Sequence, residues 1–333
     1  MTAPDTGPVS RADARVLRRR GERARTALIL AGMLVLLLVT GVGVAAVVGG
    51  GGGVGGAAGG GAAASPSASA TAPPPWATSI PSPQFTGEPA AVVALCDRPE
   101  VQQALAAGDD AAVIEAAGGG EGFRQAVIGG AAPCVNLRDA SHVWFVVNKT
   151  LPIEPIDYAP YDWIAPPGTT NGANAAARTD IAPTLGEMAS AASAAGVGQL
   201  GVQNGYRGYS IQQRIHSQRV AELGREAGER LAARPGYSEH QTALAVDVFA
   251  CDPGCGSSEQ FGGSALSAWV VENGWRFGWI VRYEQGYTPI TGYDPEAWHL
   301  RYIGPELAAA YRAGGFHTLE EFFGLPAAPA YLD

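Results

Sequence analysis

Two of the chain's five histidines lie near carboxylates at spacings suited to metal chemistry. Asp247 follows His240 by seven residues, and Glu296 precedes His299 by three. Two imidazoles and one carboxylate suffice for a catalytic zinc, because three protein ligands leave the fourth tetrahedral position open for water. The pattern predicts His240, Asp247 and His299 as zinc ligands. The spacing alone does not show that the two histidines meet in space.

The two carboxylates are expected to have different roles. If Leu244 to Phe249 is a strand, Asp247 shares a face with Ala245 and Phe249 and can point from a sheet into a pocket. Glu296 is then free to act as a base, taking a proton from the attacking water and later giving it to the leaving amine.

The other metal-binding side chains fit structural roles better. His142, His216 and His317 have no clustered ligand type beside them, and we expect them to be structural or surface residues. Cys251 and Cys255 are weak zinc candidates, since no second cysteine pair lies nearby. The turn residues between them suit a small disulfide instead.

Beyond the metal-binding positions, several segments resemble VanY-type D-alanyl-D-alanine carboxypeptidases, and they occur in the order of that family. The resemblance covers about residues 144 to 325. The segments that carry it are Ser238-x-His240 with Asp247, Glu296-x-Trp298-His299, Val147-Asn148-Lys149-Thr150, Gly205-Tyr206-Arg207, Ile290-Thr291-Gly292-Tyr293 and Arg301-Tyr302-Ile303-Gly304.

The resemblance implies a hedgehog-like zinc peptidase fold, Glu296 as catalytic base, and Arg207 at the active site. Arg207 could stabilise the oxyanion or receive a substrate carboxylate, and both roles stay open. Ser238 could bind substrate or cap the turn before His240. Two positions depart from the family pattern: Ala243 stands where glycine is usual, and Ala297 where proline is frequent.

The function that the resemblance implies is a zinc-dependent D,D-carboxypeptidase acting on the terminal D-Ala-D-Ala bond of peptidoglycan stem peptides. One alternative is a D,D- or L,D-endopeptidase that cuts peptidoglycan cross-links. Another is a catalytically inactive peptidoglycan-binding protein, whose signature would be a missing ligand or base. The three predicted ligands, His240, Asp247 and His299, and the predicted base Glu296 are all present here. The sequence does not indicate an oligomeric state.

The N-terminal part of the chain predicts a membrane anchor. Residues 1–26 are rich in arginine, and Ala27 to Val48 is an uncharged apolar run long enough to cross a bilayer. Positive charge before the run predicts a single-pass cell-membrane protein with its catalytic domain extracellular. A cleaved signal peptide, cut around Ala62 to Ala64, is the alternative.

Composition then separates a linker from the folded part. Residues 49–88 consist mainly of Gly, Ala, Ser, Thr and Pro and predict a disordered tether. Residues 89–139 predict a small helical lead-in, and residues 140–326 the peptidase domain. The net charge is −9 despite the basic start, so the remainder is acidic and nucleic acid is excluded as a partner.

We expect an α+β fold with a central, mostly antiparallel sheet flanked by helices. Strands are predicted at residues 143–147, 244–249, 275–283 and 298–303. A long helix is predicted from Ser210 to about Ala233, with Ile211, Leu223 and Leu231 among its inward residues.

The four cysteines suit an oxidising compartment. Of the three possible connectivities, we expect Cys96 to pair with Cys134 and Cys251 with Cys255, because each pair lies within one local segment.

Overall fold

The structure is a computed structural model that describes residues 95–252 and 254–332. The chain divides into two compact units, residues 1–69 and 70–333, and every described residue belongs to the second. The basic segment, anchor and linker expected over residues 1–88 lie outside the described residues. Among the helices that the structure describes, none is both long and apolar enough to cross a membrane.

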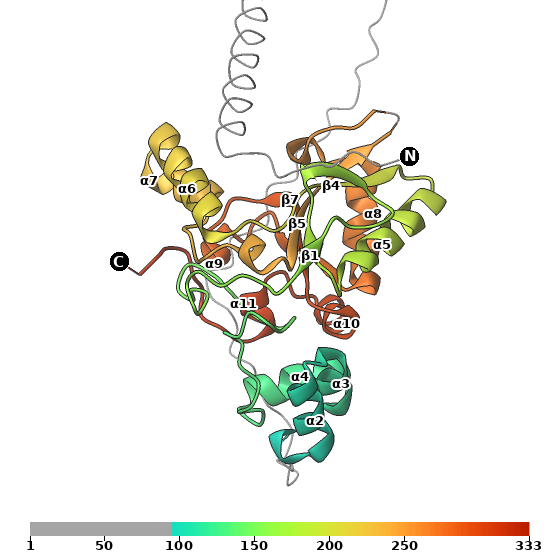
Figure 1. The fold of residues 1–333 in the computed structure, drawn as a ribbon, viewed down its shortest axis with the longest axis vertical. Coiled ribbons are helices and arrows are strands. Elements are labelled where there is room, and N and C mark those ends of the chain that lie inside the picture. Colours follow the sequence, from blue (N-terminus) through green and yellow to red (C-terminus); the bar gives the residue numbers. More distant parts are fainter. Residues whose placement is uncertain (1–94, 253, 333) are drawn as a thin grey trace, which may run out of the picture. The chain divides into compact units, whose positions relative to one another are not determined.

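A five-stranded mixed sheet forms the centre of the fold (Figure 1). Its strand order is β2-β4-β5-β7-β6; only β2 and β4 run parallel, so the predicted mostly antiparallel sheet is confirmed. A separate small sheet pairs β1 with β3. The strands are β1 (Trp163–Ile164), β2 (Thr170–Asn174), β3 (Ala177–Arg178), β4 (Gln199–Asn204), β5 (Ala245–Cys251), β6 (Trp279–Tyr283) and β7 (Glu296–Tyr302).

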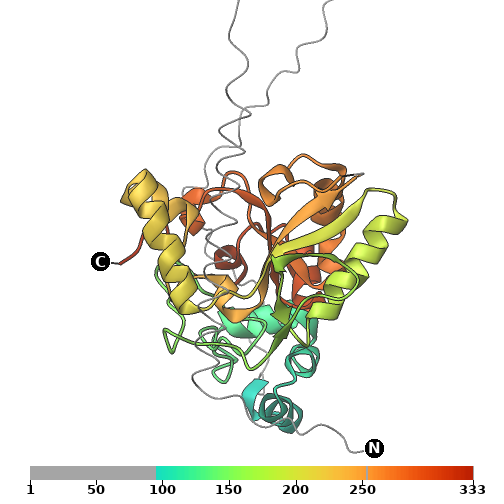
Figure 2. The same ribbon diagram turned by 45° about the horizontal axis from the view of Figure 1, so that its top comes forward.

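Helices flank this sheet on two sides. Figures 1 and 2 both show α5 and α8 on one side and the α6–α7 pair on the other. The helices of the peptidase region are α5 (Ala182–Ala194), α6 (Tyr209–Leu223), α7 (Arg225–Leu231), α8 (Ala265–Asn273), α9 (Thr288–Thr291), α10 (Pro305–Ala313) and α11 (Leu319–Phe322). Short 3₁₀ helices are η2 (Glu239–Thr242), η3 (Ser258–Gln260) and η4 (Gly274–Phe277).

The N-terminal lead-in is helical, as its composition indicated. It contains the 3₁₀ helix η1 (Leu95–Asp97) and the helices α2 (Pro99–Ala107), α3 (Asp110–Ala116) and α4 (Gly119–Ile128). A disulfide joins Cys96 to Cys134 across this lead-in, and a second joins Cys251 to Cys255. Both predicted pairings are therefore confirmed, and no described cysteine is free.

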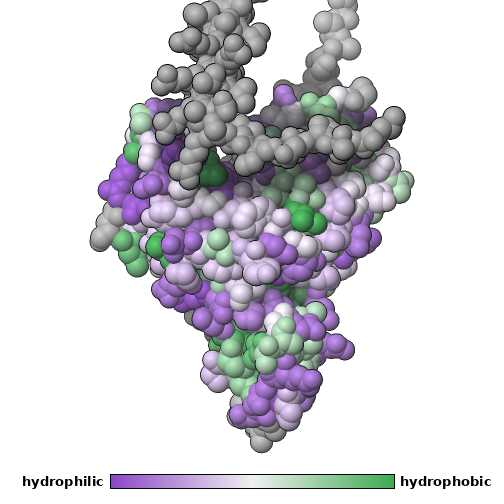
Figure 3. All heavy atoms as spheres, in the orientation of Figure 1, coloured by the Kyte–Doolittle hydropathy of each residue, from purple (hydrophilic) through white to green (hydrophobic). Residues whose placement is uncertain are grey.

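Part of the main hydrophobic core lies between the sheet and α5. Leu185 and Met188 of α5 are fully buried, in one cluster with Val202 of β4 and with Val246 and Val248 of β5. These β5 residues alternate with Ala245, Asp247 and Phe249, which face away from that core because side chains alternate along a strand. One face of β5 thus packs against the core, and the other face carries Asp247. The surface face seen in Figure 3 is mostly hydrophilic, with hydrophobic residues in isolated groups.

The predicted long helix over residues 210–233 is wrong in two respects. Gly224 interrupts it with φ 80° and ψ 164°, which separates α6 from α7. Ile211, Leu223 and Leu231 are 44%, 47% and 44% exposed, so they do not form an inward face. The two helices pack chiefly on each other, and their apolar residues do not join the central core.

Two predicted strands also differ. Residues 143–147 are buried but form no strand. The carbonyl oxygens of Val143 and Phe145 accept hydrogen bonds from the side chain of Arg301, and therefore not from the backbone of a neighbouring strand. Strand β6 begins only at Trp279, because η4 and Gly278, with φ 85°, precede it.

The disulfides should stabilise the fold unequally, because they close loops of different length. Cys96 and Cys134 are 38 residues apart, whereas Cys251 and Cys255 are four apart. Loop entropy predicts a loss of about 4 kcal/mol for the paired substitution Cys96→Ser with Cys134→Ser, and about 2 kcal/mol for Cys251→Ser with Cys255→Ser. Denaturant unfolding of the two full-length variants measures this difference, and a larger loss for the shorter loop would contradict it.

Candidate metal centre

The register of two strands brings two of the predicted ligands together. Strands β5 and β7 pair antiparallel with Asp247 directly opposite His299, and Asn204 of β4 pairs with Asp247 on its other side. Side chains directly opposite each other lie on the same face of a sheet. Accordingly, Asp247 Oδ1 lies 3.2 Å from His299 Nδ1, and Asn204 Nδ2 donates to Asp247 Oδ2 over 3.2 Å.

His240 reaches the same point from η2. The chain leaves η2 through Ala243, which has φ 57° and ψ 17° and is the one described non-glycine residue with positive φ. This left-handed turn, where glycine is usual in the family pattern, leads directly into β5. As a result His240 Nε2 lies 3.3 Å from Asp247 Oδ1.

The outer nitrogen of each imidazole is held by an acceptor. His240 Nδ1 donates to the carbonyl oxygen of Gly205 over 2.8 Å, and His299 Nε2 lies 3.0 Å from Glu239 Oε2. A Cβ at Gly205 would collide with the carbonyl of Ala176, so only glycine allows this approach. With their outer nitrogens donating, His240 Nε2 and His299 Nδ1 present lone pairs to one point whenever the two rings are neutral.

The donor set fits a zinc ion. One ligand atom each from His240, Asp247 and His299 lies within 4.8 Å of the others, and the three residues are only 4%, 7% and 3% exposed. Two neutral imidazole nitrogens and one carboxylate oxygen match the ligands of a catalytic zinc site with one position open. All three side chains are buried, and each is oriented by a hydrogen bond on its outer side. The structure thus brings the three predicted ligands together.

Glu296 lies beside this cluster at the start of β7. Its Oε2 is 3.7 Å from His299 Nδ1, and its side chain is 18% exposed. Burial raises the pKa of Glu296 to about 7, an effect that His299 opposes and Asp247 reinforces. A carboxylate that titrates near neutrality can both accept and return a proton at physiological pH.

Arg207 borders the cluster from the loop after β4. Its backbone N–H donates to the carbonyl of His240 over 3.0 Å, which ties the loop to η2. Its Nη2 lies 3.9 Å from Asp247 Oδ2, and its side chain is 20% exposed. A guanidinium in this position can neutralise negative charge next to the ligand cluster.

All six predicted site residues line one cleft of about 330 Å³. Ser238 is among them, and its hydroxyl makes no capping hydrogen bond to η2, so the capping role considered from the sequence is not observed. The cleft residues are Arg207, Gln212, Ile215, Arg219, Leu231, Ala232, Ala233, Ser238, Glu239, His240, Asp247, Glu259, Tyr283, Tyr293, Glu296, Trp298 and His299.

Sequence reasoning missed Glu239, whose side chain is fully buried behind His299. Burial alone would raise the pKa of Glu239, but Arg282, Arg301 and His299 outweigh it and hold the pKa far below the usual range. Glu239 directly precedes a ligand in the sequence. Its partners Arg282 and Arg301 are distant along the chain, so only the fold reveals their association.

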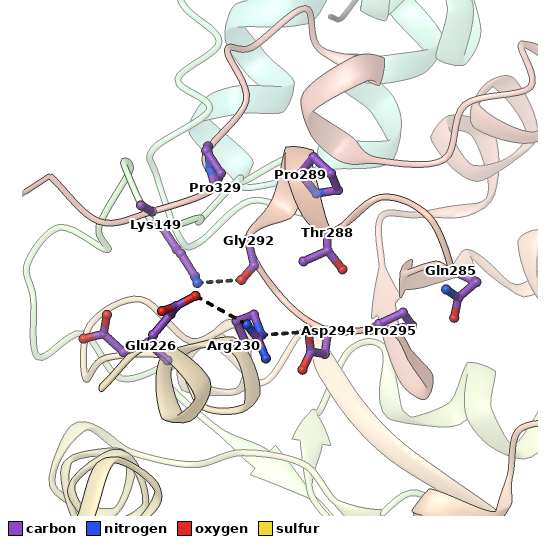
Figure 4. Close-up of a pocket in the computed structure, with 12 residues that line it drawn as sticks. Lys149, Glu226, Arg230, Gln285, Thr288, Pro289, Gly292, Asp294, Pro295 and Pro329 are labelled. Carbon is purple, nitrogen blue, oxygen red and sulfur yellow. Dashed lines mark hydrogen bonds and ion pairs between the residues drawn. The ribbon is translucent and has the colours of Figure 1, made fainter. Parts of the chain in front are cut away.

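A second cavity of about 620 Å³ is lined by residues of the segment just before Glu296, among them Gly292, Asp294 and Pro295 (Figure 4). Tyr293 and Glu296 line the cleft, while Asp294 and Pro295 between them line this cavity. Lys149 Nζ donates to the carbonyl of Gly292 over 2.6 Å, and burial lowers the pKa of Lys149 to about 8. Lys149 thereby anchors the turn that leads to Glu296.

Residues 174–305 match the family model VanY, described as D-alanyl-D-alanine carboxypeptidase. The YodJ protein of Bacillus subtilis (strain 168) is 38% identical over 146 residues, which are 44% of this chain and 53% of that protein. The D-alanyl-D-alanine carboxypeptidase of Enterococcus faecalis (strain ATCC 700802 / V583) is 39% identical over 151 residues, 43% of this chain and 53% of that protein.

Among solved structures, the LD-carboxypeptidase LdcB, described in connection with peptidoglycan recognition, shares 34% sequence identity at a TM-score of 0.50. The alignment covers 55% of this chain and 86% of that chain. The chain spans about half the length of the two curated relatives above. The segment matched to the family model contains every residue that lines the cleft.

Zinc binding should depend on pH. Although burial lowers it, the hydrogen bonds to Asp247 and Glu239 raise the pKa of His299 to about 9 in the metal-free chain. Below that pH, zinc must displace a proton from His299, so apparent zinc affinity should rise by about tenfold per pH unit between about pH 6 and pH 8. Calorimetry in buffers of different ionisation enthalpy counts the released protons. Zinc affinity that stays constant over this range would contradict the assignment.

Proposed function

This chain belongs to the VanY D-alanyl-D-alanine carboxypeptidase family, and on that basis we propose that it is a zinc-dependent D,D-carboxypeptidase. Its substrate is a peptidoglycan stem peptide, from which it removes the terminal D-alanine. The observation that carries the proposal is the convergence of His240, Asp247 and His299 in one cleft with Glu296 and Arg207 beside them.

The residues of the cleft divide the reaction between them. A zinc ion held there would supply Lewis acidity to polarise the scissile carbonyl and to acidify the attacking water. Glu296 takes the proton of that water on a carboxylate oxygen and returns it to the leaving amine of D-alanine. Arg207 supplies positive charge for the developing oxyanion or for the terminal carboxylate of the substrate. Ser238, which lines the cleft, is a further substrate contact in this account.

L,D-carboxypeptidase activity is the second candidate function. It is favoured by the similarity to LdcB, an LD-carboxypeptidase of which this chain covers 86%. The two activities use the same metal chemistry and differ in the residue that precedes the cleaved bond. That residue would be a D-alanine for the first activity and an L-configured centre for the second. Two further alternatives come from the sequence. A cross-link endopeptidase would need to accept a longer, cross-linked substrate, and a peptidoglycan-binding protein would bind without turnover.

For the location we propose a single-pass cell-membrane protein whose peptidase part is extracellular. Two disulfides among the described residues support an oxidising compartment. The arginine-rich start, followed by the apolar run Ala27 to Val48, supports the orientation.

The activity can be tested by mass analysis of defined stem peptides incubated with the full-length chain, with and without a zinc chelator. We expect a pentapeptide ending in D-Ala-D-Ala to lose one D-alanine, and the chelator to abolish the loss. Loss of D-alanine from the tetrapeptide alone would establish the L,D activity instead. Cleavage of cross-linked dimers alone would indicate an endopeptidase, and no cleavage of any substrate would favour the inactive binding protein.

Replacing each carboxylate should separate ligand from base. Asp247→Ala leaves two imidazoles, too few to hold zinc tightly, so zinc content and activity should fall together. Glu296→Ala should keep near-stoichiometric zinc while the rate falls by about 10²-fold or more. His240→Ala and His299→Ala serve as ligand controls and should behave like Asp247→Ala. Zinc analysis and peptide hydrolysis provide the readouts, and a Glu296→Ala chain that loses zinc or stays active would overturn these roles.

A further inference from the structure

The ring of His299 is held between two carboxylates. Nδ1 lies 3.2 Å from Asp247 Oδ1, while Nε2 lies 3.0 Å from Glu239 Oε2. An ionised carboxylate can only accept a hydrogen bond, so Nε2 must carry a proton that it donates to Glu239. When the ring is neutral, Nδ1 therefore keeps its lone pair and presents it to the ligand cluster.

Glu239 is itself fixed by two arginines. Its second oxygen, Oε1, accepts from Arg282 Nε and from Arg301 Nη1, both over 2.9 Å. Glu239, Arg282 and Arg301 are 2%, 1% and 0% exposed. A carboxylate so deeply buried remains ionised only with charged partners, and these two ion pairs also restrict it to one rotamer.

The chain of charges extends beyond the cleft. Arg282 Nη2 donates to Glu320 Oε1 over 2.9 Å, and Asn148 Nδ2 donates to the same oxygen over 3.0 Å. Arg301 also donates to the carbonyls of Val143 and Phe145. Residues 143–148 and helix α11, which carries Glu320, lie outside the segment 174–305 matched to the family model.

We propose that Glu239 is a positioning residue that sets the metal affinity of the site by holding His299 with Nδ1 towards the metal. Arg282 and Arg301 hold Glu239 in turn, so these two arginines act on the metal centre through the buried carboxylate. The inference rests on the proposed zinc site and adds a residue that does not touch the metal.

The substitution Glu239→Gln tests this role with little change of shape. The carboxylate accepts a hydrogen bond from His299 with one oxygen and hydrogen bonds from the two arginines with the other. An amide has a single acceptor oxygen, and its NH₂ group would face donors on whichever side it lies. The variant therefore cannot satisfy His299 and the arginines together.

Glu320→Gln is the matched control. Glu320 is equally buried and pairs with the same Arg282, but no hydrogen bond or ion pair among the described residues joins it to His299. Both variants should lose stability, because each removes one charge from a buried ion pair. In Glu239→Gln the amide oxygen should face the two charged guanidinium donors, which leaves its NH₂ group against His299 Nε2. Only this variant therefore lacks the acceptor behind the ligand, whereas a purely structural role predicts similar zinc affinity for the two variants.

The measurement is zinc affinity of the full-length chains, from competition with a chromophoric chelator. We expect Glu239→Gln to weaken zinc binding by about 10- to 100-fold, and Glu320→Gln to bind zinc like the unchanged chain. Equal affinity in all three chains, or an equal loss in both variants, would overturn the inference. An unchanged chain that binds no zinc would instead refute the proposed function, and this inference with it.

A second measurement needs no variant and keeps the inference testable if Glu239→Gln fails to fold. In the zinc-loaded, unchanged chain, ring-nitrogen NMR should show a protonated Nε2 and a metal-bound Nδ1 for His299. A proton on Nδ1, with zinc on Nε2, would overturn the positioning role of Glu239.

Discussion

The metal centre depends on the antiparallel register of β5 and β7. This register places Asp247 opposite His299 on the face of the sheet that does not pack the core, while Val246 and Leu300 pair beside them and lie in the core. A slip of one residue would exchange the faces, burying a carboxylate in apolar packing and removing a ligand from the cleft. The same hydrophobic alternation that stabilises the sheet thus fixes the geometry of the site, and His240 needs only the short η2 turn to complete it.

Burying so many charged groups near one point requires that each of them has a partner. Glu239, Arg282, Arg301 and Glu320 compensate one another, and backbone carbonyls accept the remaining donors of Arg301. Removing one partner from such a buried set commonly costs about 3–5 kcal/mol. The arrangement therefore couples the stability of the fold to the orientation of a metal ligand. It also explains why residues 143–147, although their apolar sequence predicts a strand, do not join the sheet.

The α+β class could be predicted from the pattern of expected strands and helices. The cluster of His240, Asp247 and His299 could be predicted because residue types and spacing suggested it and the resemblance to VanY-type carboxypeptidases implied that the three residues meet. His240 and Asp247 are seven residues apart at the start of a strand. The alternation of apolar residues in that strand predicts that Asp247 faces away from the core. The rest could not be predicted from local patterns. Glu239, in η2, meets Arg282 of β6 and Arg301 of β7 only in the folded chain. Ile211 and Leu231 suggested an inward helix face, but α6 and α7 form a pair of their own, and Gly224 breaks the periodicity on which the prediction relied.

Zinc K-edge X-ray absorption on the loaded full-length chain tests the central claim most directly. The account predicts two imidazole nitrogens at about 2.0–2.1 Å and carboxylate oxygen at about 2.0–2.2 Å, with no sulfur in the first shell. Sulfur at about 2.3 Å, or a single imidazole, would contradict the assignment of His240, Asp247 and His299 as the ligands.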